Sequence, residues 1–226
     1  MPTLIFRTFG SDLDGIASII SEFAQGRNPN YPKVHCSALV LPSSQLFQGR
    51  WKESVGQDGN AEIIYQLWNS EETKVVASGD EEILQLLATY SVVGIRDDYP
   101  HWKSKGYDPT AGKPVWVPSY DNTNNAETAT YHHHILFDDN IHNLPHDGIA
   151  CVRREATVDD SAATSTYETV PGDVLIEEEY QGVHLVRVPT IEPVLNPDWF
   201  LDAIEKAQVA LQQKLRQYNR CDEGET

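Results

Sequence analysis

The fold prediction for this chain rests on His134-Ile135-Leu136-Phe137-Asp138-Asp139-Asn140, a short apolar run that ends in two adjacent carboxylates. Such a run predicts a buried strand that delivers its acids to the carboxyl edge of an α/β sheet, where ligands bind in folds of this kind. Neighbouring carboxylates repel each other unless a positive group lies beside them. Mg²⁺ is the natural candidate, since it takes oxygen ligands and keeps part of its water shell. The alternative is a solvated turn that uses Asp and Asn for turn chemistry.

Strand-like and helix-like segments alternate along the rest of the chain. An apolar run at 3–8 is followed by a turn at 9–11 and by apolar residues at helical spacing up to residue 24. Further strand-like runs lie at 75–77, 91–95, 115–117, 148–152 and 183–188, and helical patterns lie at 80–90 and 199–218. This alternation predicts an α/β fold, a Rossmann-like and mostly parallel sheet with helices on both faces.

The segments between these elements define the expected domain organisation. Residues 27–74 are irregular and are interpreted as an insertion, with a polar, glycine-containing loop at 48–60. Residues 156–182 are polar and acidic, which predicts a loop or hairpin. We therefore expect one domain over 1–218, followed by a disordered tail at 219–226.

Composition excludes several functional classes. The chain has 226 residues and a net charge of -17, so it repels phosphate backbones, and we expect no nucleic-acid partner. No apolar run approaches the ~20 residues that cross a bilayer, which predicts no membrane partner. The amino terminus shows no secretory signal. The three cysteines, Cys36, Cys151 and Cys221, have no paired spacing, which argues against a disulfide framework or a thiolate zinc site. A cytoplasmic location is the resulting expectation.

Three features suggest a phosphate site. Thr8 ends the first predicted strand beside a helix amino terminus, where a hydroxyl and free N–H groups, including those of Phe9 and Gly10, suit an oxyanion. Lys113 offers one compact cation in the constrained sequence Gly-Lys-Pro. Asp138 and Asp139 provide carboxylate oxygens of the kind that Mg²⁺ prefers.

In this order, the motifs resemble those of the haloacid dehalogenase-like (HAD) superfamily: Phe6-Arg7-Thr8-Phe9-Gly10 its second motif, Gly112-Lys113-Pro114 its third, and the run ending in Asp138-Asp139-Asn140 its fourth. The resemblance covers about residues 3–155. It implies that Thr8 binds the phosphoryl group and that Lys113 steadies this group and the nucleophile. It also implies that Asp138 is the chief Mg²⁺ ligand, with Asp139 a ligand or a neighbouring support. The partner implied is a small phosphorylated molecule or a phosphoprotein.

The first motif of that superfamily, a strand ending in Asp-x-Asp, is missing from its expected place. Only Met1 and Pro2 precede the Thr8 strand. Asp12 and Asp14 have the right spacing, but they follow a turn, and their place in a first helical turn is explained by the helix dipole. We therefore expect a truncated or catalytically incomplete phosphatase, in which Asp12 is a weak candidate for the nucleophile.

Two alternatives remain open. A non-catalytic binding or interaction protein would suit the long irregular segments, since loops carry recognition. A metal-binding protein would use histidines near the acid pair, which are His132, His133, His134, His142 and His146. Asp97 and Asp98, at another predicted strand end, are interpreted as a second acid pair or as a solvated turn.

Overall fold

The computed structural model describes residues 2–55, 61–120, 133–141, 148–156, 166–175 and 180–222. The chain divides into two compact units, Met1–Lys103 and Ser104–Thr226, and each is described by itself. The single domain over 1–218 expected from the sequence stays a prediction.

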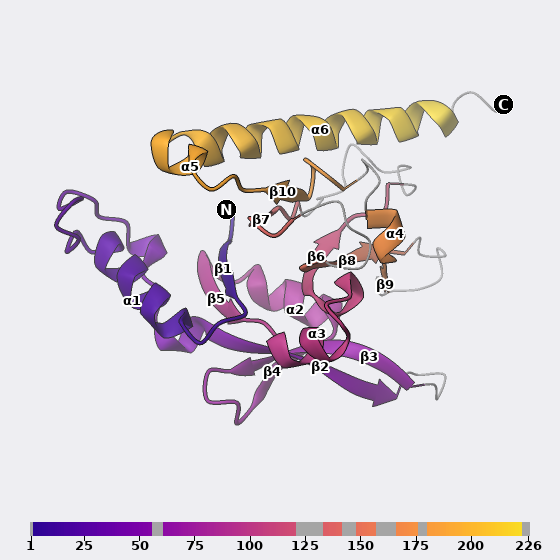
Figure 1. The fold of residues 1–226 in the computed structure, drawn as a ribbon, viewed down its shortest axis with the longest axis horizontal. Coiled ribbons are helices and arrows are strands. Elements are labelled where there is room, and N and C mark those ends of the chain that lie inside the picture. The colour runs from indigo at the N-terminus through magenta and orange to yellow at the C-terminus, as the bar shows by residue number, and fades with distance from the viewer. Residues whose placement is uncertain are drawn as a thin grey trace. The chain divides into compact units, whose positions relative to one another are not determined.

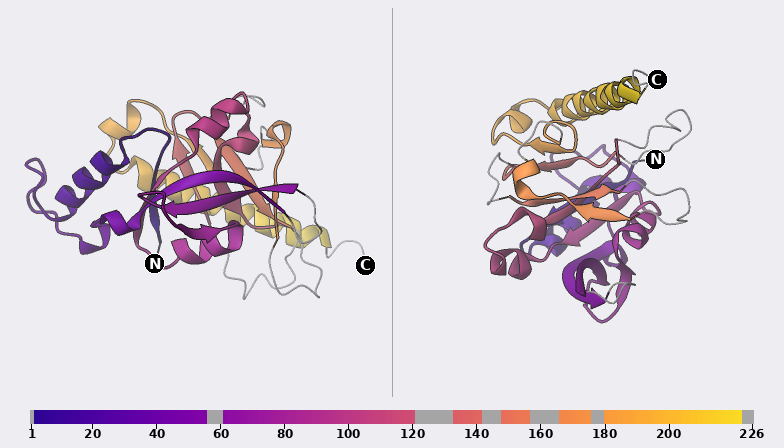
Figure 2. Two further views of the ribbon diagram at one scale, coloured as in Figure 1. Left: turned by 90° about the horizontal axis from the view of Figure 1, so that it is seen from below. Right: turned by 90° about the vertical axis from the view of Figure 1, so that its right-hand side faces the viewer.

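The first unit is built on a mixed sheet. Its elements are β1 (Leu4–Thr8), α1 (Leu13–Ala24), the 3-10 turns η1 (Ser37–Leu39) and η2 (Ser43–Gln45), β2 (Leu46–Val55), β3 (Ala61–Asn69), β4 (Val75–Ser78), α2 (Asp80–Leu87), β5 (Val92–Arg96) and α3 (Tyr99–Ser104). The strand order is β1-β5-β2-β3-β4 among the described residues (Figure 1). β5 pairs in parallel with both β1 and β2. β3 runs antiparallel to β2 and β4, and β2 with β3 forms the long twisted ribbon in the left view of Figure 2.

Helix α1 covers one face of this sheet. Leu13 and Ala17 of the helix form an apolar cluster with Leu46 of β2 and Val92 of β5. Gly94 of β5 allows the close approach, because a Cβ atom there would lie 3.0 Å from Leu13 and 2.8 Å from Leu46. The helix follows the turn after β1, and the same packing therefore fixes the position of that turn at the carboxyl end of the strand.

The fold predicted from the sequence is wrong. That prediction was a Rossmann-like, mostly parallel sheet with helices on both faces and an irregular insertion. The region 27–74 supplies β2 and β3, two of the strands at the centre of the mixed sheet, and their pairing is antiparallel. Residues 48–55 of the expected loop at 48–60 are strand, because residues 47–52 alternate between two faces, and residues 56–60 lie outside the described residues. Phe47 and Trp51 lie on one face, and polar side chains such as Gln48 and Arg50 lie on the other.

The second unit holds two smaller groups of strands. Its elements are η3 (Pro109–Ala111), β6 (Lys113–Val117), β7 (Leu136–Asp138), β8 (Ala150–Glu155), β9 (Tyr167–Thr169), α4 (Gly172–Leu175), β10 (Leu185–Arg187), α5 (Glu192–Leu195) and α6 (Trp199–Asp222). Among the described residues, β8 lies between β6, to which it is parallel, and β9, to which it is antiparallel. β7 pairs in parallel with β10.

The long helix α6 provides much of the apolar packing of the second unit. Its buried residues Leu211 and Leu215 pack against Tyr120 and Val183, which lie just after β6 and just before β10. The right view of Figure 2 looks nearly along this helix. The helical pattern at 199–218 predicted α6, and the apolar run at 134–137 predicted β7. No helix in the described parts of the chain combines the length and apolarity that crossing a membrane requires.

Candidate functional site

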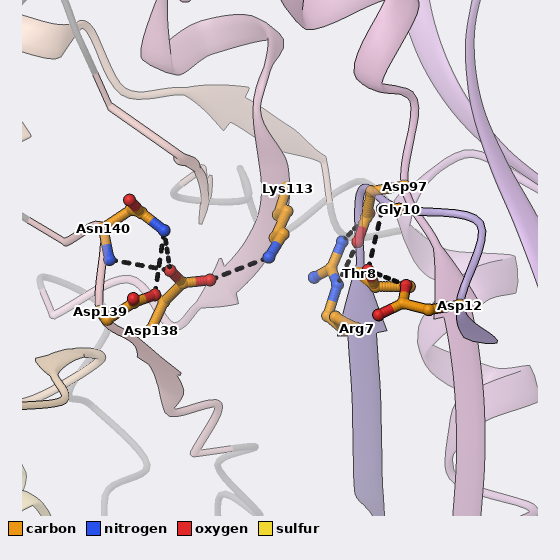
Figure 3. Close-up of polar contacts among 9 residues, drawn as sticks. All are labelled: Arg7, Thr8, Gly10, Asp12, Asp97, Lys113, Asp138, Asp139 and Asn140. Carbon is orange, nitrogen blue, oxygen red and sulfur yellow. Dashed lines mark hydrogen bonds and ion pairs between the residues drawn. The ribbon is translucent and has the colours of Figure 1, made fainter. Parts of the chain in front are cut away.

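The residues predicted to form one phosphate and Mg²⁺ pocket fall into two groups (Figure 3). The first unit holds Thr8, Phe9, Gly10 and Asp12, and the second holds Lys113, Asp138 and Asp139. The structure brings residues together within each group. A pocket that contains all of them stays a prediction.

Lys113 is placed by a close contact of its own backbone. Gly112 runs so near the start of β8 that a Cβ atom there would lie 2.4 Å from the Ile149 carbonyl oxygen, which only glycine avoids. The Lys113 N–H then donates to this same oxygen at 2.7 Å and opens the β6–β8 pairing. Lys113 is 4% exposed, so its ammonium group needs a partner inside the protein.

Asp138 is that partner. Lys113 Nζ lies 2.8 Å from Asp138 Oδ2, although the residues are far apart in the sequence. The other oxygen, Oδ1, accepts hydrogen bonds from the Asn140 backbone N–H at 2.9 Å and from its side-chain amide at 3.2 Å. Both carboxylate oxygens are therefore held in place, one by a cation and one by a turn, at the carboxyl end of β7.

These contacts keep Asp138 ionised. Burial opposes ionisation, but the Lys113 ammonium and the Asn140 hydrogen bonds outweigh it, so the pKa of Asp138 is lowered from its ordinary value. Asp139 is exposed, and its Oδ1 accepts one hydrogen bond from the Asn140 amide at 2.9 Å. We call Lys113, Asp138, Asp139 and Asn140 the acid–lysine group. It offers one fixed carboxylate and one accessible carboxylate side by side.

The Thr8 group of the first unit is organised differently. The Thr8 hydroxyl accepts the Gly10 N–H at 2.8 Å and donates to Asp12 Oδ1 at 2.9 Å. Gly10 is exposed, and a Cβ atom there would lie 2.6 Å from the same Asp12 oxygen. The Thr8 hydroxyl, which was predicted to bind phosphate, is thus hydrogen-bonded to the Asp12 carboxylate. The Phe9 ring stacks on Trp102 with 4.8 Å between centroids.

Asp97 and Asp98 are buried, so their interpretation as a solvated turn is wrong. Arg7 forms an ion pair with Asp97 through Nη2 and also donates from Nε to Asp97 Oδ2 at 3.0 Å. Tyr65 donates to the same carboxylate at 2.5 Å. Burial and the Asp97 charge raise the pKa of Tyr65 well above its ordinary value, so this hydroxyl keeps its proton. Asp98 accepts from the Trp51 N–H at 3.0 Å.

The second unit also contains a histidine network that was not predicted from the sequence. His184 is fully buried between Tyr120, whose hydroxyl lies 2.8 Å from Nε2, and the His134 carbonyl, 2.8 Å from Nδ1. His133 Nε2 lies 2.8 Å from the Val183 carbonyl oxygen. The alternating run at 183–188 was the available signal, because it placed His184 on a face of a predicted strand. His132, His142 and His146 lie outside the described residues.

Within the described ranges, no three His, Cys, Asp or Glu side chains lie close enough together to hold a metal ion. A cation at the acid–lysine group would therefore have the two adjacent carboxylates as its charged protein ligands, an arrangement that Mg²⁺ accepts because water or substrate oxygens complete its shell. Comparison of the chain with protein families, with characterised proteins and with solved structures yields no match.

Proposed function

We propose that the acid–lysine group binds Mg²⁺ and, through the metal, the phosphoryl group of a small phosphorylated molecule. The observation that carries the proposal is the buried contact of 2.8 Å between Lys113 Nζ and Asp138 Oδ2. A buried lysine that holds an ionised aspartate beside a second, exposed aspartate gives two fixed charges of opposite sign at one strand end. Phosphoryl sites use such groups, the anion for the metal and the cation for the phosphate oxygens.

The charges of the group set an order of binding. Two carboxylates and one ammonium leave a net negative charge, so a phosphate dianion is repelled in the absence of metal. A divalent cation reverses the sign of the site. Mg²⁺ would be held by Asp138 and Asp139 and would supply a Lewis acid for phosphate oxygens. Phosphate binding should therefore depend on Mg²⁺, whereas Mg²⁺ binding should not depend on phosphate.

The proposal concerns binding, and hydrolysis would need a nucleophile as well. Asp138 and Asp139 are engaged as metal ligands in this proposal, and Asp12 is the candidate of the sequence analysis. Its carboxylate accepts a hydrogen bond from the Thr8 hydroxyl, which lowers its nucleophilicity because one lone pair is engaged. We therefore expect metal-dependent binding and slow turnover.

Titration calorimetry tests the proposal. The wild type should bind one Mg²⁺, Asp138→Asn should weaken this binding at least ~10-fold, and Asp198→Asn should leave it unchanged. Asp198 is a matched control because it is an exposed aspartate of the same unit, outside the acid–lysine group. Phenyl phosphate should bind only when Mg²⁺ is present, and Lys113→Gln should weaken phenyl phosphate more than Mg²⁺. Equal Mg²⁺ affinity in Asp138→Asn and Asp198→Asn would show that the proposal is wrong.

A further inference from the structure

A second polar group lies in the first unit, on one face of its sheet. β5, β2 and β3 are neighbouring strands of the sheet (Figure 1). Their register places Arg96 opposite Gln48 and Gln48 opposite Trp68. Directly paired residues on neighbouring strands point to the same face of a sheet. Arg96, Gln48 and Trp68 therefore form one row across three strands, which we call the polar row.

The polar row contains unsatisfied hydrogen-bonding atoms. Gln48 is only 9% exposed, and its Oε1 has no hydrogen-bond partner. The buried Trp68 Nε1–H, on the strand beside it, also has none. Leaving a buried polar atom unpaired costs about 1–3 kcal/mol, so native proteins rarely retain one without a reason. Here an acceptor and a donor lie opposite each other, and a hydroxyl group placed between them would satisfy both.

Arg96 adds a positive charge at one end of the row. Its guanidinium makes no hydrogen bond or ion pair with a described residue, whereas Arg50, two residues after Gln48 on the same face, is paired with Glu72 at 2.6 Å. Thr8 is opposite Arg96 on the β1 side, but its hydroxyl already donates to Asp12. Arg96 can therefore offer its planar fork of N–H groups to a carboxylate.

Strand geometry limits the size of the ligand. Neighbouring strands are about 4.8 Å apart, so the row spans about 10 Å from Arg96 to Trp68, and the long arginine side chain reaches over part of that distance. The pairing of β3 with β4 is irregular between Leu67 and Trp68. Such irregularities redirect a side chain and are common beside binding sites.

We propose that the polar row binds a small 2-hydroxycarboxylate. The carboxylate pairs with Arg96, and the hydroxyl donates to Gln48 Oε1 while it accepts from Trp68 Nε1–H. This proposal does not depend on the acid–lysine group, because it needs no metal and uses only residues of the first unit.

Glycolate and acetate form a matched pair of probes, since they differ by one hydroxyl. The experiment follows the indole N–H resonance of Trp68 in the ¹⁵N-labelled full chain, assigned with Trp68→Phe, in buffer with EDTA so that Mg²⁺ plays no part. Glycolate should shift this resonance and bind at least ~10-fold more tightly than acetate, because a site built for a hydroxyl discriminates against its absence. Gln48→Leu should remove the preference for glycolate while acetate binding persists.

Arg96→Gln and Arg50→Gln give the charge control, because each removes one arginine from the same face of the sheet. Arg96→Gln should lose glycolate binding, and Arg50→Gln should retain it. Equal affinity for glycolate and acetate in the wild type, or unchanged glycolate binding in Arg96→Gln, would overturn the proposal. Tighter binding of inorganic phosphate than of glycolate at the Trp68 resonance would also overturn it.

Discussion

Acidification from pH 7 to pH 5 should destabilise the protein, because His184 is buried in its neutral form. A carbonyl oxygen only accepts hydrogen bonds, so His184 Nδ1 carries the proton that it donates to the His134 carbonyl. Nε2 is then the acceptor for the Tyr120 hydroxyl. Burial lowers the pKa of His184 to about 3. The hydrogen bond to the His134 carbonyl opposes this shift, and the charges of His133, His134 and Lys214 add to it.

The size of the effect follows from the difference in pKa between the folded and unfolded states. An unfolded histidine titrates near pH 6.5, so between pH 6.5 and pH 3 the unfolded chain binds a proton at this position that the folded chain does not. Stability contributed by His184 is complete above pH 6.5 and falls by ~1.4 kcal/mol for each unit of pH below it. At pH 5 the loss amounts to about 2 kcal/mol.

Urea unfolding of the wild type and of His184→Gln at pH 7.0, 6.0 and 5.0 measures the pH-dependent contribution of His184 to the unfolding free energy. Glutamine can still accept a hydrogen bond from the Tyr120 hydroxyl but does not titrate. The unfolding free energy of His184→Gln should therefore vary less with pH than that of the wild type, by about 2 kcal/mol over this range. His133, whose pKa is also lowered by burial, is present in both proteins. Parallel pH profiles for the two proteins would refute the neutral, buried state of His184.

Three further predictions concern the buried network of the first unit, and each is measured by urea unfolding at pH 7. Gly49→Ala should lower the unfolding free energy by about 1–3 kcal/mol, because the added Cβ atom would lie 1.7 Å from the Tyr65 hydroxyl oxygen. Gly15→Ala is the control: its added Cβ atom would have no neighbour within 4 Å, and it should stabilise α1 by about 0.5–1 kcal/mol. Tyr65→Phe removes a hydrogen bond of 2.5 Å to Asp97 and should cost about 1–3 kcal/mol. Arg7→Met leaves the buried Asp97 charge without its cation and should cost about 3–5 kcal/mol; a smaller loss than in Tyr65→Phe would contradict this.

Local elements of the fold could be predicted from the sequence, but their assembly could not. The helical spacing from Leu13 onward and the apolar runs at 91–95 and 134–137 gave the correct element types, since a single segment carries these patterns. The direction in which β3 pairs with β2 depends on contacts between two separate segments, whose paired residues are 6 to 22 positions apart. The polar face of β2, which carries Gln48 and Arg50, favours a loop by its composition, although the alternation of polar and apolar residues indicates a strand.

For the candidate site too, the sequence indicates individual residues but not which of them come into contact. Lys113 and Asp138 were both assigned from the sequence to a phosphate and Mg²⁺ site, whereas the ion pair between them was not predicted and is seen only in the structure. The polar row could not be foreseen, because its members at positions 96, 48 and 68 become neighbours only through the register of three strands. His184 likewise acquires its role from Tyr120 and His134, which no sequence motif connects to it.

The surroundings of Asp12 and Asp138 explain why the second unit is the better candidate for an anion site. Asp138 is the last residue of β7, and Asp12 lies in the turn that follows β1. Asp138 has a buried lysine beside it, so its charge is compensated and a metal ion can reverse the sign of the site. Asp12 is exposed and is held by the Thr8 hydroxyl, a neutral donor. A phosphate at Thr8 would have to displace that carboxylate or share a cation with it, whereas a phosphate at the acid–lysine group needs only the metal.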